Sequence, residues 1–446
     1  MKIKKYLCIS SIFLSLAGII TCSYLRFESY NFNPNNVINN IEYLSSDDFK
    51  GRLSGSDSNN SATYEIANAF KNYGLEPLSE SYFEDFSVKS PVRNNEDITL
   101  NISDKDKIVK EFKVGYDFKE DMLNFKTTNV QISNKDKIEI APRSICVLKD
   151  NKTYLFTVTL DKDFSFRSSF YCDSIFDFVI QINTNTFNEI LNSIRKGYIL
   201  NINLPYKIED IKISNVVGKI HGTNSELPPL VFTAHFDHVG VDSLGKVYNG
   251  ALDNASGTAF LLELARTYST LKPPKRDIIF VALNAEEFGL LGSKEFYNKH
   301  EDLLKDSEII NFDMIGAKED TLTFILGTSY ENKKSDLLND LKFYSSTLNT
   351  SYKVNYENSS DHASFNEKDI DSVTICHSDL TNIHTPRDTF EKLSTNSIKS
   401  VYNLINKKTI NYAYYPIVIL FYKAYTLIFF IILFIISSYI YHKKIR

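Results

Sequence analysis

The second half of the chain alternates between short apolar runs and longer segments whose apolar residues recur at helical spacing. The apolar runs predict buried strands near residue 231 and at 277–283, 308–313, 321–326 and 373–375. The segments between them predict helices at 257–268, 293–299, 331–347 and after 395. Strands and helices that alternate in this way predict an α/β fold, with a mostly parallel central sheet and helices on both of its faces.

The first half of the chain has a different pattern of apolar and polar residues. Apolar residues line one face of two predicted helices, at 36–44 and 61–73. From residue 88 onward, short alternating segments between charged turns predict strands, and a strand, a helix and a strand close this stretch at 178–182, 186–196 and 198–204. We therefore divide the chain between its two ends into 26–87, the N-terminal part of the main domain; 88–205, an inserted β-rich module; and 206–412, the main domain.

Both ends of the chain carry apolar segments that suit a membrane. Three lysines among the first five residues precede an apolar run, and we interpret residues 1–25 as a signal peptide or a signal anchor. Residues 414–441 predict a transmembrane helix with a basic flank; the alternative for this tail is a buried core helix. If the first segment is retained, the positive-inside rule places both ends in the cytoplasm and everything between them outside it.

The composition adds little to this interpretation, but it argues against nucleic acid as a binding partner. The 446 residues carry a formal net charge of −5, with 24% charged and 43% hydrophobic residues. A chain without a basic excess gives no electrostatic case for binding nucleic acid.

Side chains of the kinds that bind metals gather where the predicted strands end. The carboxyl ends of parallel strands are where an open α/β sheet builds its site. Any one of these residues is more often a turn, cap or surface residue, so the prediction depends on their occurrence one after another. The candidates, in chain order, are His235, Asp237, Asp253, Glu286, Glu287, Asp313 and His384.

This set of side chains suits zinc. Two imidazoles and three carboxylates match a pair of zinc ions, which take both nitrogen and oxygen ligands. Five protein ligands shared by two metals leave positions for water, which is typical of a catalytic site. Glu286 and Glu287 are adjacent and cannot both face the same way on an extended segment. One can therefore bind metal while the other acts as a general base.

Six short motifs carry a resemblance to a known family. They are His-x-Asp at 235, Asp-Asn-Ala-Ser-Gly at 253, Glu-Glu-x-Gly-Leu-Leu-Gly-Ser at 286, Asn-x-Asp-Met-Ile-Gly at 311, Ser-Asp-His at 360 and His-Thr-Pro-x-Asp-Thr at 384. Together they resemble the dizinc exopeptidases of clan MH, which include secreted bacterial zinc aminopeptidases. The resemblance covers the N-terminal helices and about 215–393, and the inserted module weakly resembles a protease-associated domain.

The resemblance implies a ligand set for two Zn²⁺ ions. His235 and Asp313 would hold one ion, and Glu287 and His384 would hold the other. Asp253 would bridge both ions, placed by a strained peptide bond to the next residue.

The same resemblance implies the catalytic roles. Glu286 would accept a proton from a metal-bridging water and pass it to the leaving amine, and Asp237 would orient His235. Where relatives often have a Tyr before the last His, this chain has Ile383. The stretch 241–249 is longer than in the shortest relatives and predicts an extra loop or hairpin.

The expected function is that of a membrane-anchored zinc aminopeptidase that acts on peptides outside the cytoplasm. A carboxypeptidase or dipeptidase stays open, because no spacing identifies a carboxylate that recognises an amine. Two further alternatives are a catalytically altered relative that serves as a binding ectodomain and a single-zinc glutaminyl cyclase.

Overall fold

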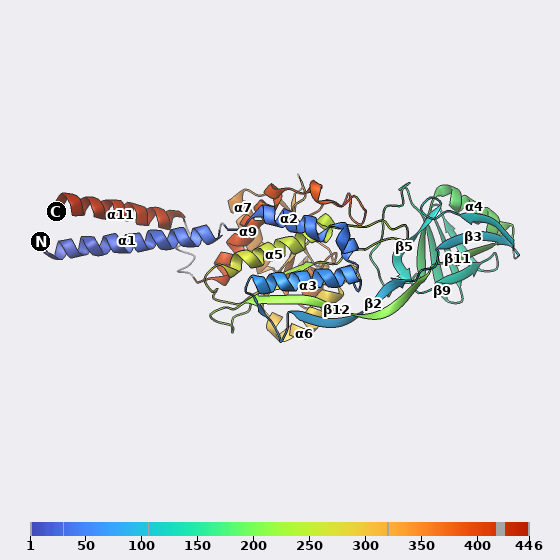
Figure 1. The fold of residues 1–446 in the computed structure, drawn as a ribbon, viewed down its shortest axis with the longest axis horizontal. Coiled ribbons are helices and arrows are strands. Elements are labelled where there is room, and N and C mark those ends of the chain that lie inside the picture. The colour runs from blue at the N-terminus through green and yellow to red at the C-terminus, as the bar shows by residue number, and fades with distance from the viewer. Residues whose placement is uncertain (1, 30, 106, 319–320, 416–423, 445–446) are drawn as a thin grey trace.

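The computed structural model describes residues 2–29, 31–105, 107–318, 321–415 and 424–444. Three parts follow one another along its longest axis: a pair of helices at one end, an α/β unit in the middle and a β-rich unit at the other end (Figure 1).

The α/β unit is built on a nine-stranded mixed sheet. Eight of its strands are, in spatial order, β1 (Glu76–Pro77), β12 (Tyr206–Ile220), β14 (Ile278–Leu283), β13 (Leu230–His235), β15 (Glu308–Phe312), β18 (Asp371–His377), β16 (Leu322–Leu326) and β17 (Tyr352–Tyr356). The four central strands, from β14 to β18, run parallel, whereas β12 and β16 are antiparallel to their central neighbours. The predicted α/β class is confirmed, with antiparallel strands flanking a parallel centre.

Helices cover both faces of this sheet. One face packs against α2 (Pro34–Leu44), α3 (Asp57–Asn72), α5 (Gly257–Ser269), α7 (Asp336–Leu348) and α9 (Thr395–Ala413), and the other packs against α6 (Leu291–Leu304) and α8 (His362–Asn366). Successive side chains of a strand point to opposite faces. Phe232 of β13 accordingly lies in the core of the first face, and Val231 lies in the core of the second face with Phe296 of α6.

Several details of this half differ from the sequence-based prediction; helix α8, for example, forms where the sequence predicted a polar loop. Helix α7 begins at Asp336 and not at 331, because the Ser335 hydroxyl accepts a hydrogen bond from the N–H of Leu338 at 2.8 Å and caps the helix there. The residues just before it form a short 3₁₀ helix, η3 (Thr328–Tyr330). Strand β17 was not predicted; it lies at the sheet edge and its side chains alternate between half-buried and exposed.

The β-rich unit contains two sheets and one helix. The first sheet has the order β5 (Phe118–Phe125), β10 (Phe178–Ile182), β9 (Lys152–Val158), β8 (Ser144–Lys149), β7 (Lys137–Ala141). The second has the order β4 (Lys107–Phe112), β3 (Thr99–Asp104), β11 (Ile199–Asn203), β6 (Asn129–Ile132). Helix α4 (Thr184–Arg195) joins β10 to β11, so the predicted strand, helix and strand are confirmed. A ribbon of β2 (Phe83–Arg93) paired with β12 leads to this unit (Figure 1).

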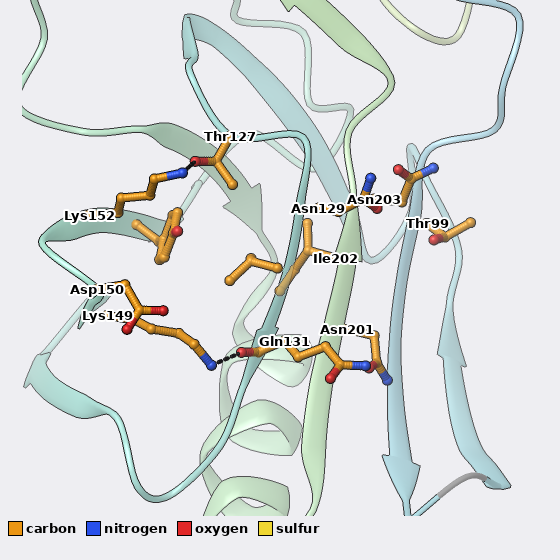
Figure 2. Close-up of a pocket in the computed structure, with 12 residues that line it drawn as sticks. Thr99, Thr127, Asn129, Gln131, Lys149, Asp150, Lys152, Asn201, Ile202 and Asn203 are labelled. Atoms are coloured by element: carbon orange, nitrogen blue, oxygen red, sulfur yellow. Dashed lines mark hydrogen bonds between the residues drawn. The ribbon is translucent and has the colours of Figure 1, made fainter.

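A polar hollow of about 680 Å³ lies within the β-rich unit (Figure 2). At its edge the Lys149 ammonium donates to the carbonyl oxygen of Gln131 at 2.6 Å, and the Lys152 ammonium donates to the hydroxyl of Thr127 at 3.1 Å. None of the candidate metal ligands lines it. The site predicted from the sequence is therefore elsewhere.

The two terminal helices lie side by side. Helix α1 (Lys2–Ser29) and helix α11 (Ala424–Lys444) form the end of the molecule opposite the β-rich unit (Figure 1), and the hydroxyls of Ser11 and Ser437 lie 2.8 Å apart. Residues 5–24 and 424–443 are long and apolar enough to cross a membrane. Leu7 of α1 is 65% exposed. Ile435 of α11 is 60% exposed, so within the described residues the tail is not a buried core helix. The predicted tail helix started at residue 414, but Tyr414 and Tyr415 are not helical, and 416–423 lie outside the described residues.

Candidate metal centre

The candidate residues meet at one edge of the central sheet. His235 is the last residue of β13, Glu286 and Glu287 follow the end of β14, and Asp313 directly follows β15. Because these strands are parallel, their carboxyl ends lie together. The loop after β18 brings His384 to the same edge.

Three of these side chains form a first set. Nε2 of His235 lies 3.5 Å from Oδ1 of Asp253 and 3.6 Å from Oδ1 of Asp313. The imidazole is almost fully buried. One nitrogen and two carboxylate oxygens therefore converge on one point.

A second set lies beside the first. Nε2 of His384 lies 3.0 Å from Oε1 of Glu287 and 3.2 Å from Oδ2 of Asp253. Asp253 thus presents one oxygen to each set, so the two sets share this carboxylate. The structure brings together all five predicted ligands in the pairing expected from the resemblance.

The backbone of Asp253 is held by an aspartate from the last motif. The carboxylate of Asp388 accepts hydrogen bonds from the N–H groups of Leu252 at 2.8 Å and Asp253 at 3.0 Å. The amide side chain of Asn254 donates to the carbonyl oxygen of Phe312 at 2.9 Å, and the peptide bond between Asp253 and Asn254 is cis. Asp388 stands in the motif that begins at His384, but its contact with Asp253 was not predicted.

Arg52 ties together the loops around the site. Its fully buried guanidinium donates to the carbonyl oxygens of Leu44, Phe236, Asn249 and Gly250, at 2.6 to 2.9 Å. Burial lowers the pKa of Arg52 to about 10, although carboxylates such as Asp253 act against that change. No pattern in the sequence predicted this role of Arg52.

The two sets fit a pair of divalent cations. Facing donor atoms are 3.0 to 3.6 Å apart, similar to the roughly 3.3 Å between ligands around tetrahedral zinc with bonds of about 2.0 Å. Oδ1 of Asp313 is buried and has no hydrogen-bond partner among the described residues. Buried carboxylates this close together are unfavourable unless a cation balances them. Histidine nitrogens with carboxylate oxygens are a donor set that zinc accepts.

Asp237 holds the loop that carries the two glutamates. Its carboxylate accepts hydrogen bonds from the N–H groups of Glu286 at 3.1 Å and Glu287 at 3.2 Å, and from the hydroxyl of Ser54 at 3.1 Å. Nδ1 of His235 lies 3.7 Å from its Oδ1 and 3.3 Å from its carbonyl oxygen. Asp237 therefore contacts both the first imidazole and the backbone of the glutamate pair.

The surroundings shift the pKa values of the two adjacent glutamates in opposite directions. Burial raises the pKa of Glu286 well above its ordinary value, and the nearby charge of His235 only partly opposes this. Burial would also raise the pKa of Glu287, but the charge of His384 and hydrogen bonds from His238 and His384 bring it well below its ordinary value. Glu287 belongs to the second set and Glu286 to neither. A pair of carboxyl groups with opposite shifts is typical of a site that divides ligand and proton-transfer roles between them.

A third histidine, His238, joins the second set. Its Nδ1 lies 3.2 Å from Oε1 of Glu287 and 3.6 Å from Oδ2 of Asp253. Its Nε2 is buried and has no hydrogen-bond partner among the described residues. If Nδ1 bound a metal, the ring proton would sit on this nitrogen as an orphaned donor, which is rarer in proteins than an orphaned acceptor. The geometry therefore favours an Nδ1–H that donates to Glu287.

This assignment predicts different results for two substitutions of His238. An Asn side chain places an N–H near the position of Nδ1, whereas a Gln side chain places it near Nε2. We expect His238→Asn to keep zinc affinity and His238→Gln to lower it about tenfold or more, since losing a partner that orients a ligand commonly costs 10- to 100-fold. Competition against a chromophoric chelator measures this. Equal losses in both variants would contradict the hydrogen-bond role and point to a direct ligand.

A segment of the β-rich unit, residues 164–171, reaches this site. The N–H of Arg167 donates to the carbonyl oxygen of His384 at 3.1 Å, and the N–H of Phe170 donates to that of Glu287 at 2.9 Å. The hydroxyl of Ser169 donates to the Glu287 carboxylate. The Phe166 ring stacks on His384, with 6.1 Å between centroids. No ligand cluster was predicted in this module, and its contacts with Glu287 and His384 were not predicted either.

The comparison with known families agrees with this geometry. The sequence profile of Peptidase family M28 matches residues 215–408, which include all seven candidate residues. Residues 215–408 are thus similar to M28 peptidases and are called the M28 domain. The resemblance stated from the motifs is therefore confirmed.

Curated relatives match the M28 domain over limited stretches. Aminopeptidase YwaD of Bacillus subtilis (strain 168) is 31% identical over 212 residues, which are 43% of this chain and 43% of the relative. A vacuolar membrane protease of Candida glabrata is 38% identical over 112 residues, which are 25% of this chain and 11% of the relative. The chain spans less than half the length of these curated relatives.

Solved structures share the fold of the M28 domain together with most of the remaining chain. An aminopeptidase from Aneurinibacillus sp. strain AM-1 aligns with a TM-score of 0.60 at 22% identity, covering 86% of this chain and 95% of that one. The zinc aminopeptidase BSAP from Bacillus subtilis aligns with a TM-score of 0.60 at 19% identity, covering 86% and 96%. The alignments show the fold.

Proposed function

We propose that this chain is a membrane-anchored, zinc-dependent aminopeptidase that hydrolyses N-terminal residues from peptides. The observation that carries the proposal is the carboxylate of Asp253, which presents one oxygen to each of two metal-binding sets. Relatives whose names state an activity include aminopeptidases, one of them a zinc aminopeptidase, and vacuolar membrane proteases, together with glutamate carboxypeptidase 2 homologs. A shared carboxylate is what a two-metal hydrolase needs to hold its ions together.

The protein's own residues supply the proton transfers. Zinc ions held by His235, Asp253, Glu287, Asp313 and His384 would polarise the scissile carbonyl group and acidify water. Glu286, next to a ligand but outside both sets, takes the proton that the attacking water loses. It then gives that proton to the amine nitrogen as the C–N bond breaks. The raised pKa of Glu286 suits a group that must hold this proton between the two steps.

The other functions considered from the sequence fit less well. A binding ectodomain has no need of a complete ligand set, and here all five ligand candidates converge. A single-zinc glutaminyl cyclase has no need of a carboxylate shared between two sets.

The two terminal helices support the membrane anchor. They lie side by side, their large apolar side chains are exposed, and some vacuolar membrane proteases are related to the M28 domain. We place the α/β and β-rich units outside the cytoplasm, because basic residues flank both helices on the side away from the α/β unit.

The full chain, solubilised in detergent, tests the proposed function. We expect it to release N-terminal residues from aminoacyl-anilides and free peptides but to leave N-acetylated peptides intact. A chelator should abolish this activity and added zinc should restore it. Release of C-terminal residues from N-acetylated peptides would instead indicate a carboxypeptidase, and activity on dipeptides alone would indicate a dipeptidase.

A further inference from the structure

A second crevice lies where the α/β unit meets the β-rich unit. It has a volume of about 420 Å³, and none of the metal-ligand candidates lines it. Its walls come from the start of α3, from the ribbon of β2 and β12, from Gly240 and Val241 after β13, and from Arg167 of segment 164–171.

Arg167 is the most unusual side chain in this crevice. It is 2% exposed, and Nη1 of its guanidinium is buried without a hydrogen-bond partner among the described residues. Within the described part of the chain, no carboxylate oxygen lies within 4 Å of the guanidinium in an ion pair. Cζ of Arg167 lies 5.9 Å from the centroid of the Tyr248 ring. Buried charges in proteins are nearly always paired and hydrogen-bonded. The guanidinium of Arg167 therefore has no ionic partner, and the crevice has room for one.

The acidic groups beside Arg167 are already engaged elsewhere. Glu120 accepts hydrogen bonds from the hydroxyls of Tyr206 at 3.2 Å and Ser243 at 2.5 Å. Asp242 pairs with the buried ammonium of Lys119 at 3.6 Å. These carboxylates balance charge at a distance but give Arg167 no direct acceptor.

The rest of the crevice also suits an anion. Helix α3 begins here, and the N–H groups of a first helical turn carry partial positive charge. The hydroxyl of Ser56 already accepts from one of them, the N–H of Asn59, at 3.2 Å. Lys50 and Arg93 are exposed on the lining. Asp48 and Asp57 also line it, so the crevice holds three cationic and two anionic side chains. This modest surplus favours a small anion of low charge over a polyanion.

We propose that this crevice binds a small oxyanion, either a carboxylate or a tetrahedral anion, through the guanidinium of Arg167. The planar guanidinium matches both shapes with paired N–H donors. The site is separate from the metal centre, and the proposal does not depend on the peptidase function.

Binding at Arg167 has a direct route to the metal centre. The backbone N–H of this residue holds the carbonyl oxygen of His384, and Ser169, two residues further on, contacts Glu287. An anion that fixes the Arg167 side chain would also fix segment 164–171 against the second metal set.

Calorimetric titration of the full chain in detergent tests the proposal with two probes. Sodium sulfate represents a tetrahedral anion and sodium acetate represents a carboxylate. We expect at least one of them to bind saturably to the wild-type protein, and the stronger binder identifies the class of ligand. We expect Arg167→Met to weaken that binding about tenfold or more, because it removes charge-assisted hydrogen bonds. Arg93→Met should weaken it less.

The matched control is Arg195→Met, which removes an exposed arginine of α4 outside the crevice. It should bind the anion like the wild-type protein. Unchanged binding by Arg167→Met would place the anion elsewhere, for example at the metal centre, and would overturn the proposal, as would the absence of saturable binding for both probes. If Arg167→Met does not fold, a double variant of Lys50→Met and Arg93→Met decides by the same criterion.

Discussion

Replacing Asp253 with Ala is expected to empty both metal positions. Its two carboxylate oxygens face Nε2 of His235 and Nε2 of His384, at 3.5 and 3.2 Å, so the substitution takes a ligand from each set at once. The wild-type protein should carry about two zinc ions per chain and the variant close to none. Elemental analysis after zinc loading and buffer exchange measures the difference.

Two single substitutions provide the matched comparison. His235→Ala removes a ligand from the first set only, and His384→Ala removes one from the second set only. Each should retain about one zinc ion per chain, because the other set keeps its ligands. An Asp253→Ala protein that is folded, as judged by circular dichroism, and still holds two zinc ions would refute the bridging role.

Replacing Glu286 with Gln is expected to remove most of the turnover while zinc stays bound. The amide has the size of the carboxyl group but cannot accept and return a proton. General base catalysis typically contributes 10²- to 10⁴-fold, so we expect kcat to fall by about that factor. Because Glu286 belongs to neither metal set, the zinc content should remain at the wild-type level.

The adjacent glutamate is the control for this variant. Glu287→Gln should lose zinc from the second set, because Glu287 pairs with both His384 and His238. The two neighbouring substitutions should thus have opposite signatures, one in turnover alone and the other in metal content. Near wild-type turnover of Glu286→Gln on a panel of aminoacyl-anilides would remove Glu286 as the base.

The sequence predicts those site residues that lie in short motifs at the ends of predicted strands. His235 and Asp313 stand directly at the ends of apolar strand segments, and Asp253 stands in a run of small residues just before helix α5. Parallel strands bring such ends together, so the order of motifs along the chain was enough to predict their convergence. The loop at 241–249 was also predictable, and Val241 and Val247 form an isolated antiparallel bridge there.

The missed contacts depend on how distant segments meet in space. His238 meets Glu287 only because the loops after β13 and β14 lie side by side, 49 residues apart in the chain. Ser169 comes from a different unit, 118 residues before the same glutamate. Neither the periodicity of apolar residues nor the spacing of motifs predicts a contact between such distant segments. Arg52 was missed for a related reason, since its partners are backbone carbonyl groups and leave no signature in side-chain pattern.

The arrangement of the three parts along one axis has a consequence for substrates. The terminal helices lie at one end of the α/β unit and the β-rich unit lies at the other (Figure 1), and Ser169 of the β-rich unit contacts the ligand candidate Glu287. With α1 and α11 in a bilayer, the whole thickness of the α/β unit separates the ligands from the lipid surface. If the chain has the proposed aminopeptidase activity, peptide ends that extend away from the lipid surface would reach the ligands, whereas peptide ends buried in the bilayer would not.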